Sequence, residues 1–225
     1  MRVWKSDIKG YLLRLLICSA GLALYGFSNT IGIKAGGAGT NAWSTLALGI
    51  SGKSGLSFGT ATFLVSLLII LIDIFGKGQL GLGTVLNIVL IPVFSDLFLL
   101  LFTRIPPVSN VIAGTAVSLI GQTLCSFATI FYMMPELGCG PRDTLMVLVG
   151  KRFPRVPIGV IKFCVEITAL LVGVLLGAPF GPGTVLIMVL QAAIFQAVCR
   201  ILHFEPRDIR HEVFRETFRN LTHRA

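Results

Sequence analysis

The apolar residues of this chain gather into six long runs, separated by short turns that contain glycine, proline or lysine. Each run holds about 18 or more residues with few charges, the length that a helix needs to cross a hydrocarbon core of about 30 Å. Because a span must satisfy its own backbone groups inside lipid, these runs predict α-helices. The predicted spans are 11–33, 58–75, 84–102, 111–134, 158–176 and 184–202.

Two shorter apolar segments interrupt this plan, one over 41–49 and one within 138–152, and each follows a glycine-rich stretch. At about 1.5 Å per residue, helices of this length cannot cross the membrane. We expect Thr40 or Asn41 to cap the first one. Irregular backbone at membrane depth is stable only where protein or a water-filled cavity covers it. The segments therefore predict two broken, re-entrant helices that face the bundle interior. Short interfacial helices joined by surface loops are the alternative.

The second half of the chain repeats the plan of the first. Residues 81–90 match residues 181–190 at seven of ten positions, at an offset of 100. Glycines at the corresponding turns also match at an offset of 101, Gly37 with Gly138 and Gly39 with Gly140. Apolar helices resemble one another by composition, but matched glycines at turns are harder to explain in that way. The pattern predicts an internal repeat within one transmembrane domain over 1–204, with copies at about 11–103 and 111–203.

Three spans per copy is an odd number, which turns the second copy upside down relative to the first. The basic residues agree, because cytoplasmic segments carry an excess of Lys and Arg. With the N-terminus inside, the inner segments hold the basic tail and Arg2, Lys5, Lys9, Lys77, Arg142, Lys151, Arg152 and Arg155. The outer loops hold Lys34, Lys53 and Arg104. An inverted repeat in the cell membrane with both termini cytoplasmic is therefore predicted. Eight spans in parallel repeats fit the charges nearly as well, but the short helices fall below the roughly 20 residues of a span.

Composition agrees with a polytopic, all-α transmembrane bundle. The 225 residues are 54% hydrophobic and 13% charged, with a mean hydropathy of +0.86, whereas a soluble domain is about a quarter charged. The net charge of +9 lies at segment ends and in the tail, where it sets topology, so nucleic-acid binding is not expected. Five single cysteines without Cys-x-x-Cys spacing predict neither a disulfide framework nor a metal site. No cofactor is expected.

The segment 205–225 differs from the rest of the chain because it is basic. Its apolar residues recur near helical spacing at Ile209, Val213, Phe214, Phe218 and Leu221. This pattern predicts an amphipathic cytoplasmic tail that lies on a charged membrane surface and contacts anionic lipid.

Three motifs carry a resemblance to a known family. They are Gly-x-Gly-Pro-Arg-Asp at 138–143, the basic Gly-Lys-Arg at 150–152, and Gly-Pro-Gly-Thr-Val-Leu at 181–186. Up to about Leu202 the chain resembles the YczE/YyaS/YitT-type bacterial integral membrane proteins, and is most similar to the YczE branch. Asn41-Ala42-Trp43 departs from the Pro-Trp pattern of that branch. The resemblance implies a multi-span cell-membrane protein of undefined biochemical function, and it supplies neither a substrate nor a catalytic residue.

Candidate site residues follow from the broken helices, because transporters with inverted repeats bind solutes where such helices meet. The candidates are the polar and glycine residues of the two motifs and of nearby spans: Asn41, Trp43, Asp96, Gln122, Gly138, Gly140, Arg142, Asp143 and Gln196. Asp96 lies well inside a span, where an acidic residue is costly and needs an interior partner. We interpret it as a coupling carboxylate or as a neutral structural acid, with Gln122 and Gln191 as expected neighbours.

The remaining charged residues have both functional and structural interpretations. Arg142 and Asp143 open the second short helix as a solute or gating pair, or as ordinary topology and dipole charges. The glycine alignment places them opposite Asn41 and Ala42. Lys162 and Glu166 stand four residues apart, which favours a structural pair on one helix face. We expect Asp73, near Lys77 and the end of its span, to be an interfacial anchor.

These patterns lead to two hypotheses about function. The first is a secondary transporter or permease for a small solute, with its site between the repeats. The second is a non-transporting membrane scaffold or accessory protein that acts through its basic tail. No enzyme is expected, because the three histidines lie at or beyond the last span and no nucleophile motif occurs. A homodimer is compatible with the sequence, which does not argue for one.

Overall fold

The computed structural model describes residues 8–76, 78, 80–204 and 212 of the chain. Within these residues the chain forms eight α-helices and one short 3-10 turn, η1 (Gly36–Ala38). The helices are α1 (Ile8–Lys34), α2 (Ala42–Ser54), α3 (Phe58–Phe75), α4 (Leu82–Leu101), α5 (Val111–Met133), α6 (Pro141–Arg152), α7 (Ile158–Leu175) and α8 (Pro182–Ile201). The described residues contain no strand, which confirms the all-α fold class.

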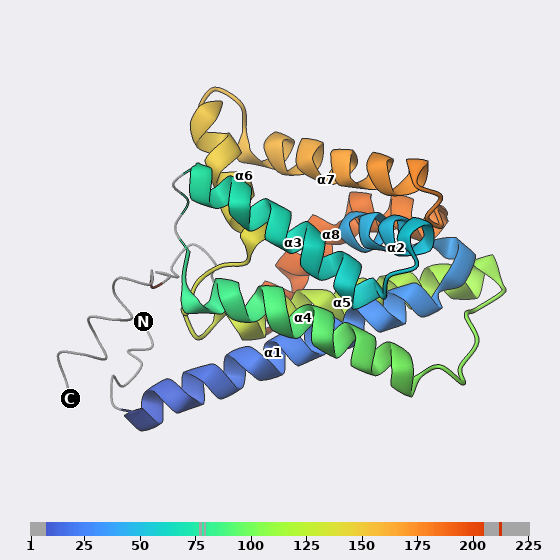
Figure 1. Cartoon of the computed structure of the whole chain (residues 1–225), viewed down its shortest axis with the longest axis horizontal. Coiled ribbons are helices and arrows are strands. Elements are labelled where there is room, and N and C mark those ends of the chain that lie inside the picture. Colours follow the sequence, from blue (N-terminus) through green and yellow to red (C-terminus); the bar gives the residue numbers. More distant parts are fainter. Residues whose placement is uncertain (1–7, 77, 79, 205–211, 213–225) are drawn as a thin grey trace.

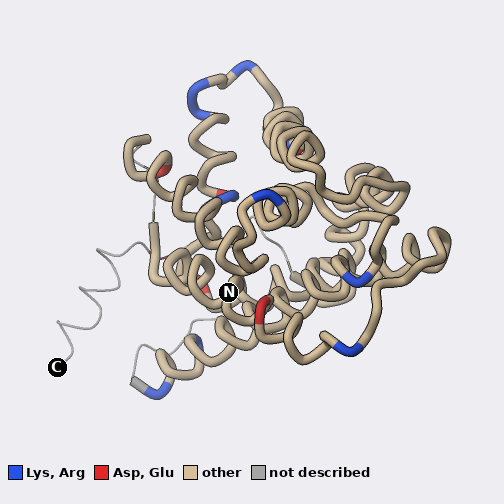
Figure 2. The backbone as a smooth tube through the Cα atoms, turned by 45° about the vertical axis from the view of Figure 1, so that its right-hand side comes forward, with Lys and Arg blue, Asp and Glu red and all other residues tan. Residues whose placement is uncertain are grey.

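Five described helices, α1, α3, α4, α5 and α8, are long and apolar enough to cross a membrane. Their ends fall within about three residues of the ranges predicted from hydropathy. Helix α7 has 18 residues, as many as α3, and its role as a sixth span stays a prediction. Large apolar side chains such as Phe75 and Ile112 are more than four-fifths exposed, as expected for residues that face lipid. Figure 2 shows that charged residues lie mostly at helix ends and in turns.

The residues at the starts of four helices explain why these helices begin where they do. The Asn41 side chain accepts a hydrogen bond from the Ser44 backbone N–H at 2.9 Å, so of the two predicted caps Asn41 is the one in place. Ser57 caps α3 in the same way. Helices α6 and α8 instead begin with proline, which lacks the N–H that would be unpaired at that position.

The helices run roughly side by side, with the short helices α2 and α6 toward opposite ends of the bundle (Figure 1). Helix α1 packs most extensively against α5, and these two helices also contact α4 and α8, respectively. Helix α2 contacts α3 and α7, while α6 contacts α7 and α3. Helix α3 packs on α4, whereas α7 makes no comparable contact with α8. Each short helix is therefore held by helices from both halves of the chain.

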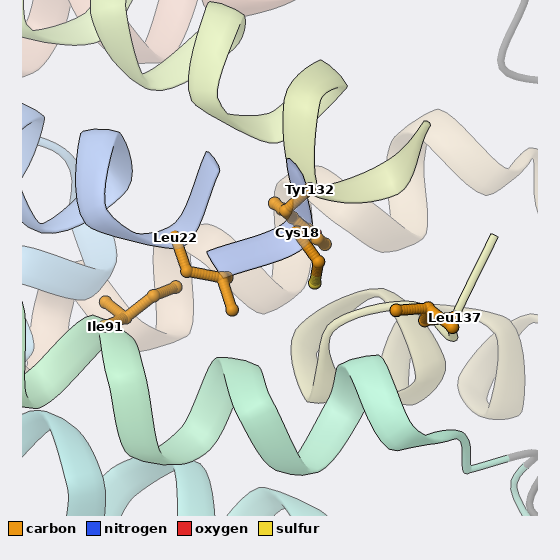
Figure 3. Close-up of a cluster of buried hydrophobic side chains, with 5 residues drawn as sticks. All are labelled: Cys18, Leu22, Ile91, Tyr132 and Leu137. Carbon is orange, nitrogen blue, oxygen red and sulfur yellow. The ribbon is translucent and has the colours of Figure 1, made fainter. Parts of the chain in front are cut away.

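A buried apolar cluster joins α1, α4 and α5 at the base of the second glycine motif. It consists of Cys18, Leu22, Ile91, Tyr132 and Leu137, all of which are at least 95% buried (Figure 3). Leu137 comes from the loop that precedes α6, so this cluster ties the loop to the long helices. The cluster fixes where α6 begins.

Glycines allow the two loops before the short helices to touch the other half of the chain. A Cβ atom placed on Gly81 would lie 2.5 Å from the carbonyl oxygen of Leu137, and one on Gly138 would lie 2.9 Å from the Gly81 Cα. Gly138 also has a φ of 129°, which other residues rarely adopt. In the opposite half, a Cβ on Gly181 would collide with the carbonyl oxygens of Gly37 and Ala38. Each loop thus packs on the first turn of α4 or α8.

The predicted amphipathic tail lies outside the described residues, apart from Glu212. The Glu212 carboxylate accepts from the Arg14 guanidinium at 2.9 Å, and its backbone N–H donates to the Glu136 carbonyl at 2.9 Å. Arg14 is 5% exposed and also donates to the Pro135 carbonyl. This contact joins the C-terminal segment to α1 and to the α5–α6 loop.

Candidate functional site

A cavity of about 310 Å³ lies between the two halves of the chain. Residues from α1, α2, α4, α5, α6, α7 and α8 line it, so every helix except α3 contributes to its wall. The N-terminal ends of both short helices open onto this cavity, through Asn41, Ala42 and Trp43 on one side and Gly140 to Asp143 on the other. Each N-terminus carries about half a positive elementary charge, because its first N–H groups have no partner within the helix.

A hydrogen-bonded set of polar residues holds the start of α2. Asn41 caps the helix, and the buried Ser44 hydroxyl donates to the Asn29 side chain at 3.3 Å. Asn29 in turn donates to the Ser95 hydroxyl at 3.2 Å, which links α2 to α1 and α4. Because these partners are buried, the α2 N-terminus has a defined position against the long helices.

The start of α6 carries the charged residues of the second motif. The Arg142 guanidinium lies over the Trp43 ring, 4.8 Å from its centroid, which is within the range of a cation–π contact. Asp143 accepts a hydrogen bond from the Tyr132 hydroxyl at 3.1 Å. The adjacent Arg142 and Asp143 therefore use different partners and do not form an ion pair with each other.

The side of the cavity formed by α7 and α8 holds a second charged group. The Lys162 ammonium lies 3.9 Å from the Glu166 carboxylate, and the Gln191 amide also donates to Glu166. Glu166 is 8% exposed, whereas the Lys162 side chain is 51% exposed. Paired and hydrogen-bonded in this way, Glu166 has no uncompensated charge directed at the cavity.

Six of the nine predicted site residues line this cavity: Asn41, Trp43, Gln122, Gly140, Arg142 and Asp143. Gly138 lies behind it against Gly81, and Gln196 is exposed on the outer surface of α8. Solute binding by these six residues stays a prediction. Trp43 and Arg142 are each the second residue of their helix, whereas the predicted glycine alignment pairs Arg142 with Asn41.

Asp96 lies away from the cavity and has a local partner. Its carboxylate accepts from the Ser57 hydroxyl at 2.5 Å and from the Gly59 backbone N–H at 2.6 Å. These groups belong to the start of α3, so Asp96 caps that helix from α4. The expectation that Gln122 and Gln191 are its neighbours was wrong, since both line the central cavity. Periodicity within one helix could not show this contact, because it joins residues 39 positions apart.

Among the cavity residues that were not predicted is a polar one, Asn87, and the structure also buries the charged residue Asp73. Asn87 is 9% exposed and lines the cavity, and it stands where the two matched segments differ, opposite Ile187. A polar residue that breaks an otherwise apolar repeat is the signal that could have identified it. Asp73 is fully buried, and neither of its carboxylate oxygens has a hydrogen-bond partner among the described residues, so its role as an interfacial anchor stays a prediction. Lys77, its predicted neighbour, lies outside the described residues.

The loop cysteine between the glycines of the second motif shows no sign of nucleophilic chemistry. Burial raises the pKa of the Cys139 thiol, and the Thr144 hydroxyl lies 3.6 Å from its sulfur. A thiol is a weak nucleophile until it ionises. Within the described residues there is no group of three or more His, Cys, Asp or Glu side chains that could hold a metal ion.

The five long apolar helices identify a multi-pass α-helical membrane protein. Comparison with known proteins identifies its family. Residues 12–200 match the family of unknown function DUF6198, and the chain belongs to that family.

Two relatives show how far the similarity extends. The chain is 36% identical over 167 residues to an uncharacterized protein of Haemophilus influenzae, covering 74% of each chain. It is 27% identical over 186 residues to the uncharacterized membrane protein YczE of Bacillus subtilis, covering 82% of this chain and 85% of YczE. The resemblance to the YczE branch is thereby confirmed. No solved structure matches the chain.

Proposed function

We propose that this protein is a secondary transporter of a small solute and that the central cavity is its solute site. The observation that carries the proposal is the convergence of both short helices, N-terminus first, on one cavity. Discontinuous helices in corresponding positions of two halves form the solute sites of many secondary transporters. A cavity of about 310 Å³ has room for a small organic molecule.

An inverted repeat is part of this proposal, with α7 as the sixth span. The contacts support it, because exchanging α1–α4 for α5–α8 converts the main contacts between helices into one another. The pair α1–α4 becomes α5–α8, and α2–α7 becomes α6–α3. The glycine contacts are reciprocal as well, since the loop of each half packs on the other half's Gly-x-Gly-Thr turn. Trp43 and Arg142, which are equivalent by helix position, meet each other.

One pair of equivalent helices departs from this exchange. Helices α3 and α4 are clamped at Gly59, where an added Cβ would lie 2.6 Å from the Asp96 carboxyl carbon. At the equivalent Gly159 on α7, an added Cβ would meet no atom within 4 Å. Gln196, the equivalent of Asp96, is exposed. Helices α3 and α4 are thus packed together at Gly59, whereas α7 and α8 leave open space at Gly159. If the two halves exchange these conformations, access to the cavity alternates between the two sides of the membrane.

Paired cysteines test this mechanism in a background without the five native cysteines. The pair Ser57→Cys and Asp96→Cys should react with a short bifunctional thiol reagent in the conformation described here, because these side chains touch. The equivalent pair, Pro157→Cys and Gln196→Cys, should react only in the exchanged conformation. In membranes we expect each cysteine pair to form its crosslink. In a protein that carries both pairs, crosslinking one pair should reduce the yield of the other crosslink.

A rigid protein would give the first crosslink completely and the second never, under any solute condition, and this result would reject the transporter. The scaffold alternative is examined in parallel by deleting residues 213–225. This truncation keeps Glu212 and its ion pair with Arg14. A scaffold that acts through its tail should lose function on truncation, whereas a transporter should retain both crosslinks.

A further inference from the structure

We propose that the cavity binds a singly charged organic carboxylate, held by the Arg142 guanidinium where it stacks on Trp43. The inference rests on the proposed function, because it names the solute class of the same cavity. It is carried by a guanidinium and a cavity-facing amide that have no hydrogen-bond partner among the described residues, and by the charge balance of the cavity wall.

The Arg142 guanidinium has N–H donors that are free to bind a ligand. Its guanidinium stacks on Trp43 at 4.8 Å, but it donates no hydrogen bond to any residue that the structure describes. The nearest acidic side chain in sequence, Asp143, is engaged by Tyr132. Guanidinium presents five N–H donors in a planar fork that matches a carboxylate in a bidentate geometry. Stacking on an indole holds that plane in place, so the fork is arranged before a ligand arrives.

Asn87 supplies the second observation. Its side chain is 9% exposed, faces the cavity, and has no hydrogen-bond partner within the described part of the chain. Its amide nitrogen lies 3.3 Å, the Tyr132 hydroxyl 3.2 Å and an Asp143 carboxylate oxygen 3.5 Å from the place that a Cβ would occupy at Gly140. Glycine at this position therefore leaves a space bordered by polar groups at the α6 N-terminus. Because the Asn87 amide opens onto the cavity, a ligand oxygen on its cavity side would accept its hydrogen bond.

The charges of the wall select for a single negative charge. Arg142 and Lys162 balance Asp143 and Glu166, and the N-termini of α2 and α6 together add about one positive elementary charge. A monoanion neutralises this excess. A dianion would meet the neighbouring carboxylate of Asp143 without enough compensation, and a cation would find Glu166 already paired with Lys162.

The rest of the wall explains why the anion should be organic. Ile91, Met133, Ile187, Met188 and Phe195 line the cavity beyond the polar groups. Apolar side chains of this kind bind a hydrocarbon portion by excluding water from it. An inorganic anion would leave this surface without a partner.

The experiment uses purified full-length protein carrying Trp4→Phe, which leaves Trp43 as the sole indole. Acetate, butanoate and benzoate are titrated while Trp43 fluorescence and the melting temperature are followed. We expect saturable binding that strengthens from acetate to benzoate, with benzamide, benzylamine and inorganic phosphate binding much more weakly. Arg142→Gln should weaken benzoate binding by about ten- to a hundredfold, because it removes hydrogen bonds to a charged group.

Further variants separate a site effect from a folding effect. Arg142→Lys keeps the charge without the fork and should bind benzoate with intermediate affinity. Arg152→Gln, at the exposed end of the same helix, should bind benzoate as the parent protein does. If Arg142→Gln fails to fold, Asn87→Ala provides the test, with an expected loss of about tenfold.

Three results would overturn the inference: benzamide or benzylamine binding as tightly as benzoate, phosphate binding more tightly than benzoate, or unchanged benzoate affinity in a folded Arg142→Gln or Asn87→Ala variant. The two proposals fail separately. Benzoate binding without the second cysteine crosslink would keep the carboxylate site and reject the transporter. Both crosslinks without any carboxylate binding would keep the transporter and reject this solute class.

Discussion

At the scale of single residues, the cost of polar groups inside a membrane protein is reduced by partners that lie far away in sequence. Asp96 is an example, since an isolated carboxylate within a span is expensive. Here it receives the Ser57 hydroxyl and the Gly59 N–H, two of the groups at the start of α3 that would otherwise be exposed to an apolar environment. Helix capping thus accounts for its position, and a role in coupling stays a prediction.

We predict that Asp96→Ala lowers the free energy of unfolding by about 1–2 kcal/mol, the usual effect of removing a cap. Asp96→Asn should lose less, because its amide oxygen still accepts from the Gly59 N–H. Thermal unfolding in detergent measures both. Gln196→Ala, at the equivalent exposed position of α8, is the matched control and should leave the melting temperature unchanged. An Asp96→Asn variant that folds normally but loses transport would restore the coupling interpretation.

At the scale of elements, two glycines that the predicted repeat pairs, Gly59 and Gly159, lie in different environments. Gly59 lets α3 approach the backbone of α4, where an added Cβ would collide with the Pro92 carbonyl oxygen. Its equivalent, Gly159, has open space beside it. The sequence match between these glycines therefore marks a contact that the second half does not make in this conformation.

Gly59→Ala should accordingly destabilise the protein by about 1–3 kcal/mol through overpacking against backbone that cannot easily move. Gly159→Ala should be neutral, or stabilising by up to about 1 kcal/mol, because alanine favours a helix more than glycine does. The difference between the two melting temperatures is the quantity to measure. Equal destabilisation by both variants would mean that α7 and α8 are also closed on each other in solution.

At the scale of the whole molecule, the orientation of the two ends follows from the direction of the short helices. Both begin at the central cavity and run outward to opposite ends of the bundle, α2 to Ser54 and α6 to Arg152 (Figure 1). If the long helices span the bilayer, these two helix ends lie on opposite sides of it.

A thiol reagent that does not cross membranes tests this arrangement. Ser54→Cys should be labelled in intact cells and Phe153→Cys only in inverted vesicles, since both positions are exposed. The parent protein with Cys164 as its single cysteine is the control, because a thiol on the lipid-facing side of α7 should stay unlabelled from either side. Labelling of both introduced cysteines from the same side would exclude the inverted arrangement.

The sequence by itself determined the class of protein and the extent of its long helices. Both depend on the length of apolar runs, and crossing a bilayer requires a fixed length of helix whatever the neighbouring helices are. The Asn41 cap was also predictable, because a cap is a contact between residues three positions apart. The family likewise followed from motifs that are continuous in the chain.

Only the tertiary structure decided which polar residues meet. Lipid surrounds a helix with a medium as apolar as its own side chains, so hydrophobic periodicity does not show which face of a span points inward. The contact of Asp96 in α4 with the start of α3 and the stacking of Arg142 on Trp43 both join separate helices, and Asn87 faces a cavity that several helices form. Tertiary packing also decides that both short helices begin at one cavity, because this arrangement depends on how the two halves pack and not on any local sequence pattern.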